Sequence, residues 1–591
     1  MGQSNNGNSD VSGISSARLG MDGPQTVSAA PAAFAPFRSR IFLAMWIASL
    51  LSNFGTLIQG VGAAWLMTSL APSADMVALV QVSTVLPIML FSLPAGAAAD
   101  VWDRRIVMLV AQGAMLAVSV ALAGLAWLGL VTPWLLIALT FLLGTGAALH
   151  GPAWQSAVRE QVPRPDLPAA VALNSVSFNL ARAAGPALGG AIVAWAGAQV
   201  AFAVNAVSYL GLIAVLLSWR WPTRKAELPP ETMTAAMLAG LRFARLSHSL
   251  QAVLVRSATF GFFAAALWAL IPLVARDLIG GGAITYGLLL AAFGGGAVGG
   301  ALLGAGIRER FTSEMIVAGG SAAFACAGLA VAFSPSLALT LLALVLGGAA
   351  WLLTLSTFNV TVQLRTPRWV VGRAMAIYQA GVFGGLALGG WLWGVVAEHY
   401  GVSTSLLAAG LALGATALLG RVLPMPATDR INLEPAPTDP VGEKARPTLD
   451  LESGPVVANT EYRIAPRDVR AFLAAALRLK RMRGRNGARR WALLHDAADP
   501  EVWVERFETP TWLDHLRVRD RMTVTDRELE NEVLALHEGE RSPATRYLLA
   551  HVPVAADGDN APEASDCWDA IFDPSLPPAM SEGRRAAVRR V

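Results

Sequence analysis

The chain has 591 residues, of which 54% are hydrophobic and 15% are charged. Soluble globular proteins average about 25% charged residues, so this composition excludes a protein that is soluble throughout. Charge is scarce between residues 41 and 423, whereas roughly the last 170 residues have a soluble composition. The net charge of +4 gives no reason to expect a nucleic-acid partner, and Cys326 and Cys567 cannot make a disulfide framework.

Apolar runs separated by Gly, Pro or charged residues predict twelve membrane-spanning helices, because about 20 apolar residues cross the hydrocarbon core. The runs lie near residues 40–66, 76–99, 104–129, 133–157, 168–195, 199–219, 252–275, 283–306, 314–333, 336–363, 370–396 and 402–422. The chain then divides into a disordered tail (1–36), a six-helix bundle (37–219), a linker (220–250), a second six-helix bundle (251–424), a linker (425–455), a soluble domain (456–555) and a disordered tail (556–591). We therefore expect an all-α membrane protein with a 6+6 arrangement, a small C-terminal α+β domain and the lipid bilayer as its surroundings.

Basic residues in the short loops predict the orientation. The loops on one side carry most of them: Arg104, Arg105, Arg308, Arg310, Arg365 and Arg368. The alternate loops contain almost none, with Arg276 as the exception. Basic loops remain in the cytoplasm, so we expect a multi-pass protein of the inner membrane with both termini cytoplasmic.

The predicted fifth span, residues 168–195, is apolar but contains Asn174, Asn179 and Arg182. An arginine at this depth costs at least about 2.5 kcal/mol unless it faces protein or water. We therefore place these three residues on a substrate pathway, where Arg182 binds an anionic group or lends its charge to a water-filled path. A structural charge held against helix carbonyls is the alternative for Arg182.

Small residues follow Arg182 and leave a smooth face on which another helix can pack closely: Gly185, Pro186, Gly189 and Gly190. A weaker copy occurs 200 residues later, with Gly389 and Gly390, and indicates two related halves. The loops before these two spans are 204 residues apart, so we predict one extra helical turn in the fifth span.

The first span has a polar face that includes Asn53, Thr56 and Gln59 at helical spacing. Polar groups are costly in hydrocarbon, so we expect this face to line a cavity, with interhelical hydrogen bonding as the alternative. Asn359 and Gln379, in the tenth and eleventh spans, are further pathway candidates.

The loop between the second and third spans contains a glycine, an aspartate four residues later and then a basic pair: Gly96, Asp100, Arg104 and Arg105. This pattern resembles the signature of the major facilitator superfamily, although Asp103 stands where that family usually has glycine. The resemblance implies the twelve-helix transporter fold and a gating latch in this loop, because carboxylate–arginine pairs at helix ends can hold one state closed. An ordinary charge cluster beside the membrane is the alternative.

The sequence Gly185-Pro186-x-x-Gly189-Gly190 resembles the antiporter motif of drug exporters in the same superfamily, with Ala181 in place of the expected upstream glycine. The longer stretch from Gly151 to Arg182, together with the C-terminal domain, resembles the enterobactin-exporter-like or transmembrane secretion effector branch. The resemblance implies secondary active export of an amphipathic small molecule (a siderophore, an antibiotic or a drug-like compound) by alternating access with ion coupling. No carboxylate lies at mid-depth in the predicted spans and His150 is the nearest titratable group, so ion coupling rests on the resemblance alone.

Other chemistries lack a motif in the sequence. There is no GxxxxGK[ST] loop that would hold ATP phosphates and no metal-ligand spacing. We therefore expect no cofactor, no metal and no enzymatic activity in the membrane domain.

The soluble domain is expected to follow a βαββαβ order, which predicts a ferredoxin-like α+β fold, with one charged helix over residues 513–537. It resembles the small antibiotic-biosynthesis-monooxygenase type, which commonly dimerises, and this allows self-association through the domain. His515 beside Trp512 leaves a cofactor-free oxygenase open, but a regulatory or dimerisation module is favoured. The alternative function of the chain is accordingly a membrane-tethered enzyme or regulatory scaffold that acts through this domain.

Overall fold

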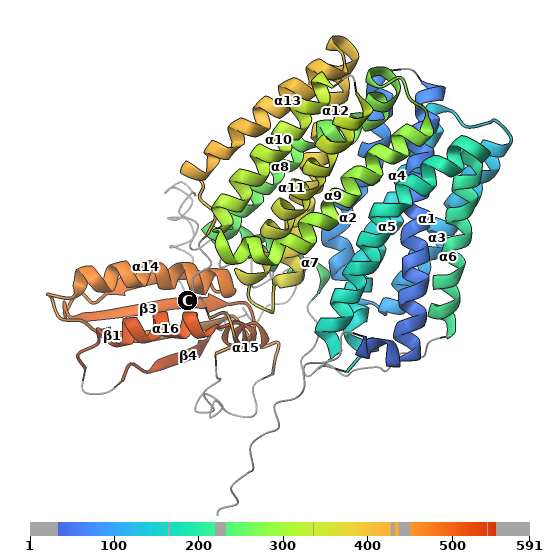
Figure 1. Cartoon of the computed structure of the whole chain (residues 1–591). Helices are drawn as coiled ribbons and strands as arrows, with labels where there is room; N and C mark the ends of the chain where they lie inside the picture. The colour runs from blue at the N-terminus through green and yellow to red at the C-terminus, as the bar shows by residue number, and fades with distance from the viewer. Residues whose placement is uncertain are drawn as a thin grey trace, which may run out of the picture.

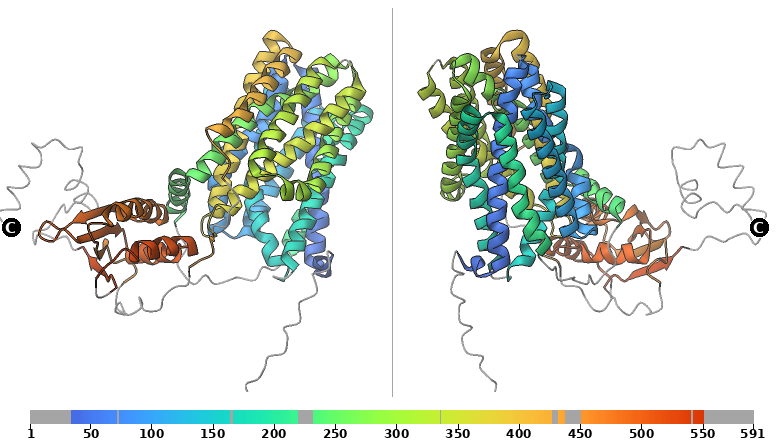
Figure 2. Two further views of the ribbon diagram at one scale, coloured as in Figure 1. Left: turned by 60° about the vertical axis from the view of Figure 1, so that its left-hand side comes forward. Right: turned by 90° about the vertical axis from the view of Figure 1, so that its right-hand side faces the viewer.

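The structure is a computed structural model that describes residues 34–71, 73–163, 166–218, 232–334, 336–426, 432–436, 450–539 and 542–550. Residues 1–33 of the predicted N-terminal tail and all of the predicted C-terminal tail (556–591) lie outside the described residues. The described chain forms a bundle of long helices with a small α+β domain beside one end (Figures 1 and 2).

The first half of the bundle contains six helices: α1 (Arg40–Leu70), α2 (Ala74–Val101), α3 (Arg104–Trp127), α4 (Pro133–Gln161), α5 (Leu167–Ala196) and α6 (Ala198–Ser218). The second half begins after a short helix, α7 (Met233–Leu246), and contains α8 (His248–Leu273), α9 (Ala283–Arg310), α10 (Ser313–Phe333), α11 (Leu337–Leu364), α12 (Val371–Tyr400) and α13 (Val402–Thr416). Thr132 and Thr312 cap the N-termini of α4 and α10 with their side chains, which accept hydrogen bonds from the third residue inside each helix.

Eleven helices within the described residues are long and apolar enough to cross a membrane. Helix α5, which carries Asn174, Asn179 and Arg182, is not among these eleven, although its 30 residues pack against α1 and α9. The hydrophobic core runs through both halves and is most continuous around α8, which is the most buried of the eleven.

The two ends of the bundle differ in the arginines that they carry. The end where α3 begins at Arg104, α9 ends at Arg310 and α12 follows Arg368 is called the basic end. The opposite end carries Arg276 in a π-helical turn after α8 and is called the Arg276 end. The soluble domain lies beside the basic end (Figure 1).

Small residues let the helices of the two halves approach closely. A Cβ atom added at Gly185 or Gly189 would lie 3.1 Å from atoms of α1, so these glycines pack α5 inside its own half. At Gly190 it would lie 2.6 Å from Ala283 O on α9, which belongs to the other half. A Cβ atom added at Gly287 of α9 would lie 2.7 Å from the main-chain oxygen of Pro186 on α5. One helix therefore binds its own half and the opposite half through adjacent glycines.

Helix α12 repeats this arrangement in the second half. A Cβ atom at Gly389 would overlap the carbonyl oxygen of Phe262 on α8, inside the same half. At Gly390 it would lie 3.0 Å from a methyl group of Val82 on α2, across the two halves. The repeat predicted from the glycine pairs therefore corresponds to equivalent packing in three dimensions.

The predicted extra turn in the fifth span is wrong. Helices α5 and α12 both contain 30 residues, and each ends at a glycine with positive φ, Gly197 at 84° and Gly401 at 86°. Because these glycines are 204 residues apart, as are the preceding loops, the two helices are equal in length. The glycine pair is displaced by one turn along α12 instead, and Gly394, one turn further on, also faces α2.

The soluble domain contains β1 (Val456–Arg463), α14 (Val469–Asn486), β2 (Arg489–His495), β3 (Val502–Thr509), α15 (Trp512–Asp520), α16 (Val524–Leu534) and β4 (Thr545–Leu549). The antiparallel strands are ordered β2-β3-β1-β4, so the two halves of a split βαβ unit interleave. The single predicted helix over residues 513–537 is wrong, because Thr523 and Asp526 form a capping box that starts a second helix.

A glycine substitution tests the contact between the two halves. In Gly190→Ala, the new methyl group would meet main-chain atoms of α9, which cannot give way unless the helices separate. Overpacking of this kind costs typically 1–3 kcal/mol, so we expect a lower melting temperature for the detergent-purified protein. The matched control is Gly113→Ala on α3, where the new methyl group meets no atom within 4 Å. Equal melting temperatures for the two variants would contradict this packing.

Candidate functional site

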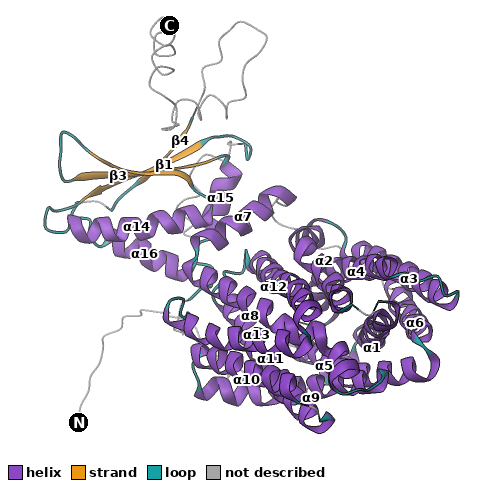
Figure 3. Cartoon of the chain, turned by 90° about the horizontal axis from the view of Figure 1, so that it is seen from above, coloured by secondary structure: helices purple, strands orange, loops and turns teal. Residues whose placement is uncertain are grey.

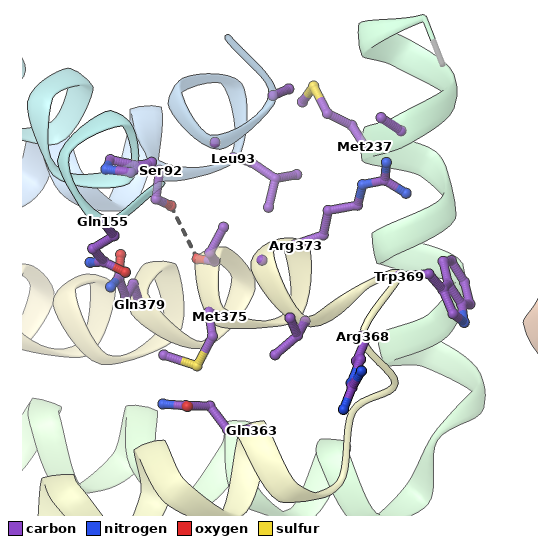
Figure 4. A pocket seen from close by; sticks show the side chains of 17 residues that line it. Ser92, Leu93, Gln155, Met237, Gln363, Arg368, Trp369, Arg373, Met375 and Gln379 are labelled. Atoms are coloured by element: carbon purple, nitrogen blue, oxygen red, sulfur yellow. Dashed lines mark hydrogen bonds between the residues drawn. The ribbon is translucent and has the colours of Figure 1, made fainter. Parts of the chain in front are cut away.

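A cavity of about 350 Å³ lies at the basic end, between α2 and α4 of the first half and α11 and α12 of the second (Figure 4). Ala236 and Met237 of α7 form part of its wall. Its other lining residues are Ser92, Leu93, Gly96, Ala97, Pro152, Gln155, Gln363, Arg368, Trp369, Val371, Gly372, Arg373, Met375, Ala376 and Gln379. Both halves of the bundle therefore contribute to one mixed polar and apolar space.

The predicted pathway residues of the second half lie in or next to this cavity. Gln379 lines it. Asn359 accepts a hydrogen bond from Gln363, which is also a lining residue. Where the halves meet beside the cavity, Ser92 donates a hydrogen bond to the carbonyl oxygen of Ala376, 3.1 Å away (Figure 4).

The predicted latch residues lie at the same end. Gly96 lines the cavity, and a Cβ atom there would meet nothing within 4 Å, so it makes no close helix contact in this structure. Asp100 lies in the last turn of α2, and its side chain is outside the described residues. Arg104 is the first residue of α3.

Arg105 holds two helices of the first half together. Its guanidinium donates to the carbonyl oxygens of Leu216 and Leu217, each 2.7 Å away, at the C-terminus of α6. A cation is favourable at the negative end of a helix dipole. Asp103 caps α3 by accepting a hydrogen bond from the Arg105 backbone, with φ at −60°, so the position that is usually glycine requires no left-handed conformation here.

Arg182 lies where the two halves meet within the bundle. Its guanidinium carbon is 5.6 Å from the ring centre of Trp268 on α8 and 5.8 Å from that of Phe178 on its own helix. Among the residues that the structure describes, it forms no ion pair with an acidic side chain. A cation over an aromatic face is stabilised when it is removed from water. The contact with Trp268 therefore offsets part of the hydration free energy that the guanidinium loses in the bilayer.

Trp268 joins this arginine to an aromatic cluster of the second half. Its ring centre is 4.8 Å from that of Phe293 and 5.8 Å from that of Trp351. The indole nitrogen of Trp268 is buried, and the described residues offer it no hydrogen-bond partner. Trp268 could not be recognised in the sequence, since an aromatic residue in an apolar span carries no polar signal.

Contacts between the halves cross the Arg276 end, beside a surface hollow of about 380 Å³ that is lined mostly by the second half. The Glu398 carboxylate of α12 accepts a hydrogen bond from the backbone nitrogen of Ala74, 2.5 Å away, at the first residue of α2. Arg276 donates to the carbonyl oxygen of Thr68, 3.2 Å away, at the end of α1. The rings of Trp65 and Tyr286 stack between α1 and α9. The cavity and these contacts thus lie at opposite ends of the bundle.

The remaining predicted pathway residues have different surroundings. Gln59 is buried and bonds Ser119 of α3 and Asn205 of α6, which favours interhelical hydrogen bonding for this residue. Asn53 is half-buried and Thr56 is exposed on the same helix. Asn174 and Asn179 are half-buried, and the amide of Asn179 donates to the carbonyl oxygen of Ser175 in its own helix.

A buried charge in the second half was missed by the sequence analysis. Arg256 of α8 is 4% exposed and forms a 2.5 Å ion pair with Glu314 at the start of α10. Glu314 also accepts a hydrogen bond from the backbone nitrogen of Met425, and Arg256 bonds the carbonyl oxygen of Leu423. This pair therefore anchors the chain that leaves α13 toward the soluble domain.

His515 is the most enclosed of the described histidines in the soluble domain. It is 2% exposed, its two buried ring nitrogens have no partner among the described residues, and its ring packs against Trp512 and Tyr547. Burial lowers the pKa of His515 to about 4, and the charges of Arg519 and Arg483 act in the same direction. A histidine so enclosed is poorly placed to exchange protons with a substrate, and no cluster of metal-binding side chains occurs in the described part of the chain.

The fold and the site, a two-half helical bundle with a cavity between the halves, define a transporter of the major facilitator type. The family whose description is "Transmembrane secretion effector" matches residues 31–553, and the chain belongs to this family. The chain is therefore a multi-span membrane protein, as predicted from its motifs.

Individual relatives agree with this class. The multidrug efflux pump Tap of Mycobacterium tuberculosis is 25% identical over 411 residues, which cover 67% of this chain and 96% of that protein. The uncharacterised MFS-type transporter YfiS of Bacillus subtilis is 27% identical over 361 residues, covering 58% of this chain and 84% of that protein.

Solved structures show the same fold. A bacterial homologue of the human lysosomal transporter Spinster, in an inward-facing and occupied conformation, aligns with a TM-score of 0.53 and 15% identity over 66% of this chain and 97% of that chain. The nucleoside transporter NupG aligns with a TM-score of 0.54 and 13% identity over 65% of this chain and 99% of that chain. In both cases the aligned share of this chain is close to the size of the helical bundle.

The buried histidine predicts an acid-sensitive soluble domain. The pKa of His515 lies below that of an unfolded histidine, so the unfolded state binds the proton first and stability falls as the pH drops from about 6.5 toward about 4. Between pH 7 and pH 5 the local unfolding free energy should fall by about 2 kcal/mol. Hydrogen exchange of β3 and α15 in the full chain, corrected for intrinsic rates, measures this loss.

The variant His515→Phe keeps a ring in the same place but cannot be protonated. It should remove most of this pH dependence while leaving protection at neutral pH close to that of the parent chain. The exposed His495→Phe serves as the control, because its ring stacks on Trp503 at the sheet surface. The same acid-induced loss in His515→Phe as in the parent chain would exclude His515 as the cause.

Proposed function

We propose that this chain is a secondary active transporter with twelve membrane helices that exports an amphipathic small molecule, such as a siderophore, an antibiotic or a drug-like compound, by alternating access coupled to an ion. The observation that supports it best is the asymmetry of the bundle. The cavity at the basic end extends between the halves and is lined by α2, α4, α7, α11 and α12, whereas the hollow at the Arg276 end lies mostly over the second half and is crossed by contacts between the halves.

Loop charge supports the orientation. The basic end carries the arginines of alternate loops, and such loops remain in the cytoplasm. In that orientation the cavity faces the cytoplasm, both termini are cytoplasmic, and the protein lies in the inner membrane. A substrate taken up from this side would leave through the Arg276 end once the contacts there had opened. Export also agrees with the named function of the mycobacterial relative, a multidrug efflux pump.

Arg182 and Trp268 supply the chemistry expected for an amphipathic substrate. A guanidinium without an acidic partner among the described residues can bind a carboxylate or phosphate, and the ring beside it can stack on an apolar or aromatic group. Gln379, Asn359, Asn53, Thr56, Asn174 and Asn179 remain proposed pathway residues. For Gln59 we propose a packing role in the hydrogen-bonded network of α1, α3 and α6.

A regulatory role of the soluble domain is a second proposal, favoured over catalysis. The domain packs against α7 of the membrane domain. His515, the residue considered for an oxygenase, is enclosed. The relatives are transporters, which are not enzymes. In the alternative function, the soluble domain of a membrane-tethered regulatory scaffold would therefore act on the transporter itself.

Efflux from cells tests the role of Arg182. Cells are loaded either with the fluorescent cation ethidium or with a fluorescent amphipathic anion. Arg182→Ala should slow export of the anion about tenfold, because the loss of charge-assisted binding costs about 1.4 kcal/mol. Arg182→Lys should retain part of the rate, since it keeps the charge but loses the planar contact with Trp268. The control is Arg310→Ala, an exposed arginine at the end of α9, with membrane levels matched by immunoblot.

Equal rates for parent and Arg182→Ala would remove Arg182 from the pathway. Equal retention of both probes in cells with and without the parent chain would count against these probe classes as substrates. A comparison of extracellular metabolites between a deletion strain and its parent then searches for the natural substrate. No difference in any exported compound would contradict export.

A further inference from the structure

Helix α7 lies between the membrane bundle and the soluble domain. Its buried face, Ala236, Ala239, Gly240, Phe243 and Ala244, packs against α2 of the first half and α12 of the second. It also contacts α8, which follows it in the chain, and α14 of the soluble domain (Figure 3). A single helix therefore contacts both halves of the bundle and the domain beyond it.

Close packing fixes α7 on α12. A Cβ atom added at Gly240 would lie 2.8 Å from the Cβ atom of Arg373, so the two helices touch at this point. Arg373 and Met237 of α7 both line the cavity at the basic end (Figure 4). The two halves cannot close this cavity unless α7 moves relative to at least one of them.

Two arginines of the soluble domain hold aromatic rings of the membrane domain. The guanidinium carbon of Arg521 lies 4.4 Å from the ring centre of Trp369, in the loop before α12. That of Arg485 lies 5.6 Å from the ring centre of Phe243 on α7. The two rings also contact each other edge to face at 5.9 Å. Cation–π contacts of this geometry are stabilising when they are partly removed from water.

Both arginines are oriented from within their own domain. Arg521 donates to the carbonyl oxygen of Asn486, 2.8 Å away, at the end of α14. Arg485 forms an ion pair with Asp526 of α16. Because these partners fix the guanidinium groups before they meet the rings, little side-chain entropy is lost on docking. The contact surface is therefore built into the folded domain.

We propose that the soluble domain is a conformational clamp: by binding Phe243 and Trp369 it holds α7 at the mouth of the cavity and keeps the basic end open. This inference rests on the proposed alternating access. Closure of the basic end requires release of the clamp, so any event that frees the domain raises the fraction of molecules open at the Arg276 end.

Pulsed electron spin resonance on the full-length chain measures the two states without a substrate. Native Cys326 and Cys567 are replaced by Ser, and spin labels are attached to Trp102→Cys in the first half and Phe311→Cys in the second. Both positions are exposed at the basic end. The distance between the labels is long when this end is open and short when it is closed.

Variants on the two sides of the contact test the clamp independently. The pair Phe243→Leu and Trp369→Leu keeps an apolar side chain at each position but removes both ring faces, while Arg521→Gln acts from the soluble domain. Each should lower the ratio of open to closed molecules about tenfold. The matched control is Phe333→Leu with Trp195→Leu, one phenylalanine and one tryptophan that are exposed at the Arg276 end. Hydrogen exchange of β3 verifies that the soluble domain stays folded.

All measurements are repeated with Gly190→Ala, which loosens the Arg276 end and should bring both states into the measurable range. If Gly190→Ala shifts the ratio but the clamp variants leave it unchanged, the clamp is excluded and alternating access stands. If the control pair shifts the ratio as much as the clamp variants, the clamp is also excluded. If a single distance persists in every variant, the proposed alternating access fails and the clamp fails with it.

Discussion

The architecture depends on how closely the helices of the two halves can approach. At Gly190 and Gly287 the main chains of α5 and α9 leave no room for a Cβ atom, and Gly390 and Gly394 provide the equivalent surface between α12 and α2. Apolar helices gain no hydrophobic free energy by associating in lipid, because lipid tails are themselves apolar. Van der Waals contact over small residues must therefore hold the halves together. Such a surface contains few side chains that would interlock, so it can separate at the cost of a small number of hydrogen bonds, such as those from Ser92 to Ala376 and from Ala74 to Glu398. This property suits a contact that has to open and close.

The two halves handle buried positive charge differently. Arg256 is paired with Glu314 and donates a hydrogen bond to the carbonyl oxygen of Leu423, which makes it part of the scaffold. Arg182 lies over Trp268, and the described residues offer it no ion pair. An aromatic face stabilises a cation less than a carboxylate does, but it does not neutralise the charge. The charge of Arg182 is therefore still able to attract an anion, whereas that of Arg256 is already compensated.

Hydropathy predicted the bundle of long apolar helices, because membrane burial constrains every residue of a span. The repeat was found from Gly189, Gly190, Gly389 and Gly390, yet its detail was misjudged, since a one-turn displacement along a helix leaves the same spacing signal as an inserted turn. The break at Thr523 could have been recognised from the Thr-x-x-Asp capping pattern. Trp268 and Glu398 could not, because their roles come from neighbours far away in the chain, Arg182 and Ala74 respectively. The cavity depends on the relative placement of five helices, α2, α4, α7, α11 and α12, that no local pattern encodes.

Helix α7 lies in the linker between the two halves, yet it contacts both the bundle and the soluble domain. Its small residues Ala236, Ala239 and Gly240 permit close contact with the bundle, while Phe243 extends toward the soluble domain. A flexible connection would transmit no force between the domains, because its ends could move independently. A helix held at both the bundle and the soluble domain couples their positions instead. The soluble domain is placed at the end where the cavity lies, so a change in its docking acts directly on the residues that must move for the cavity to close.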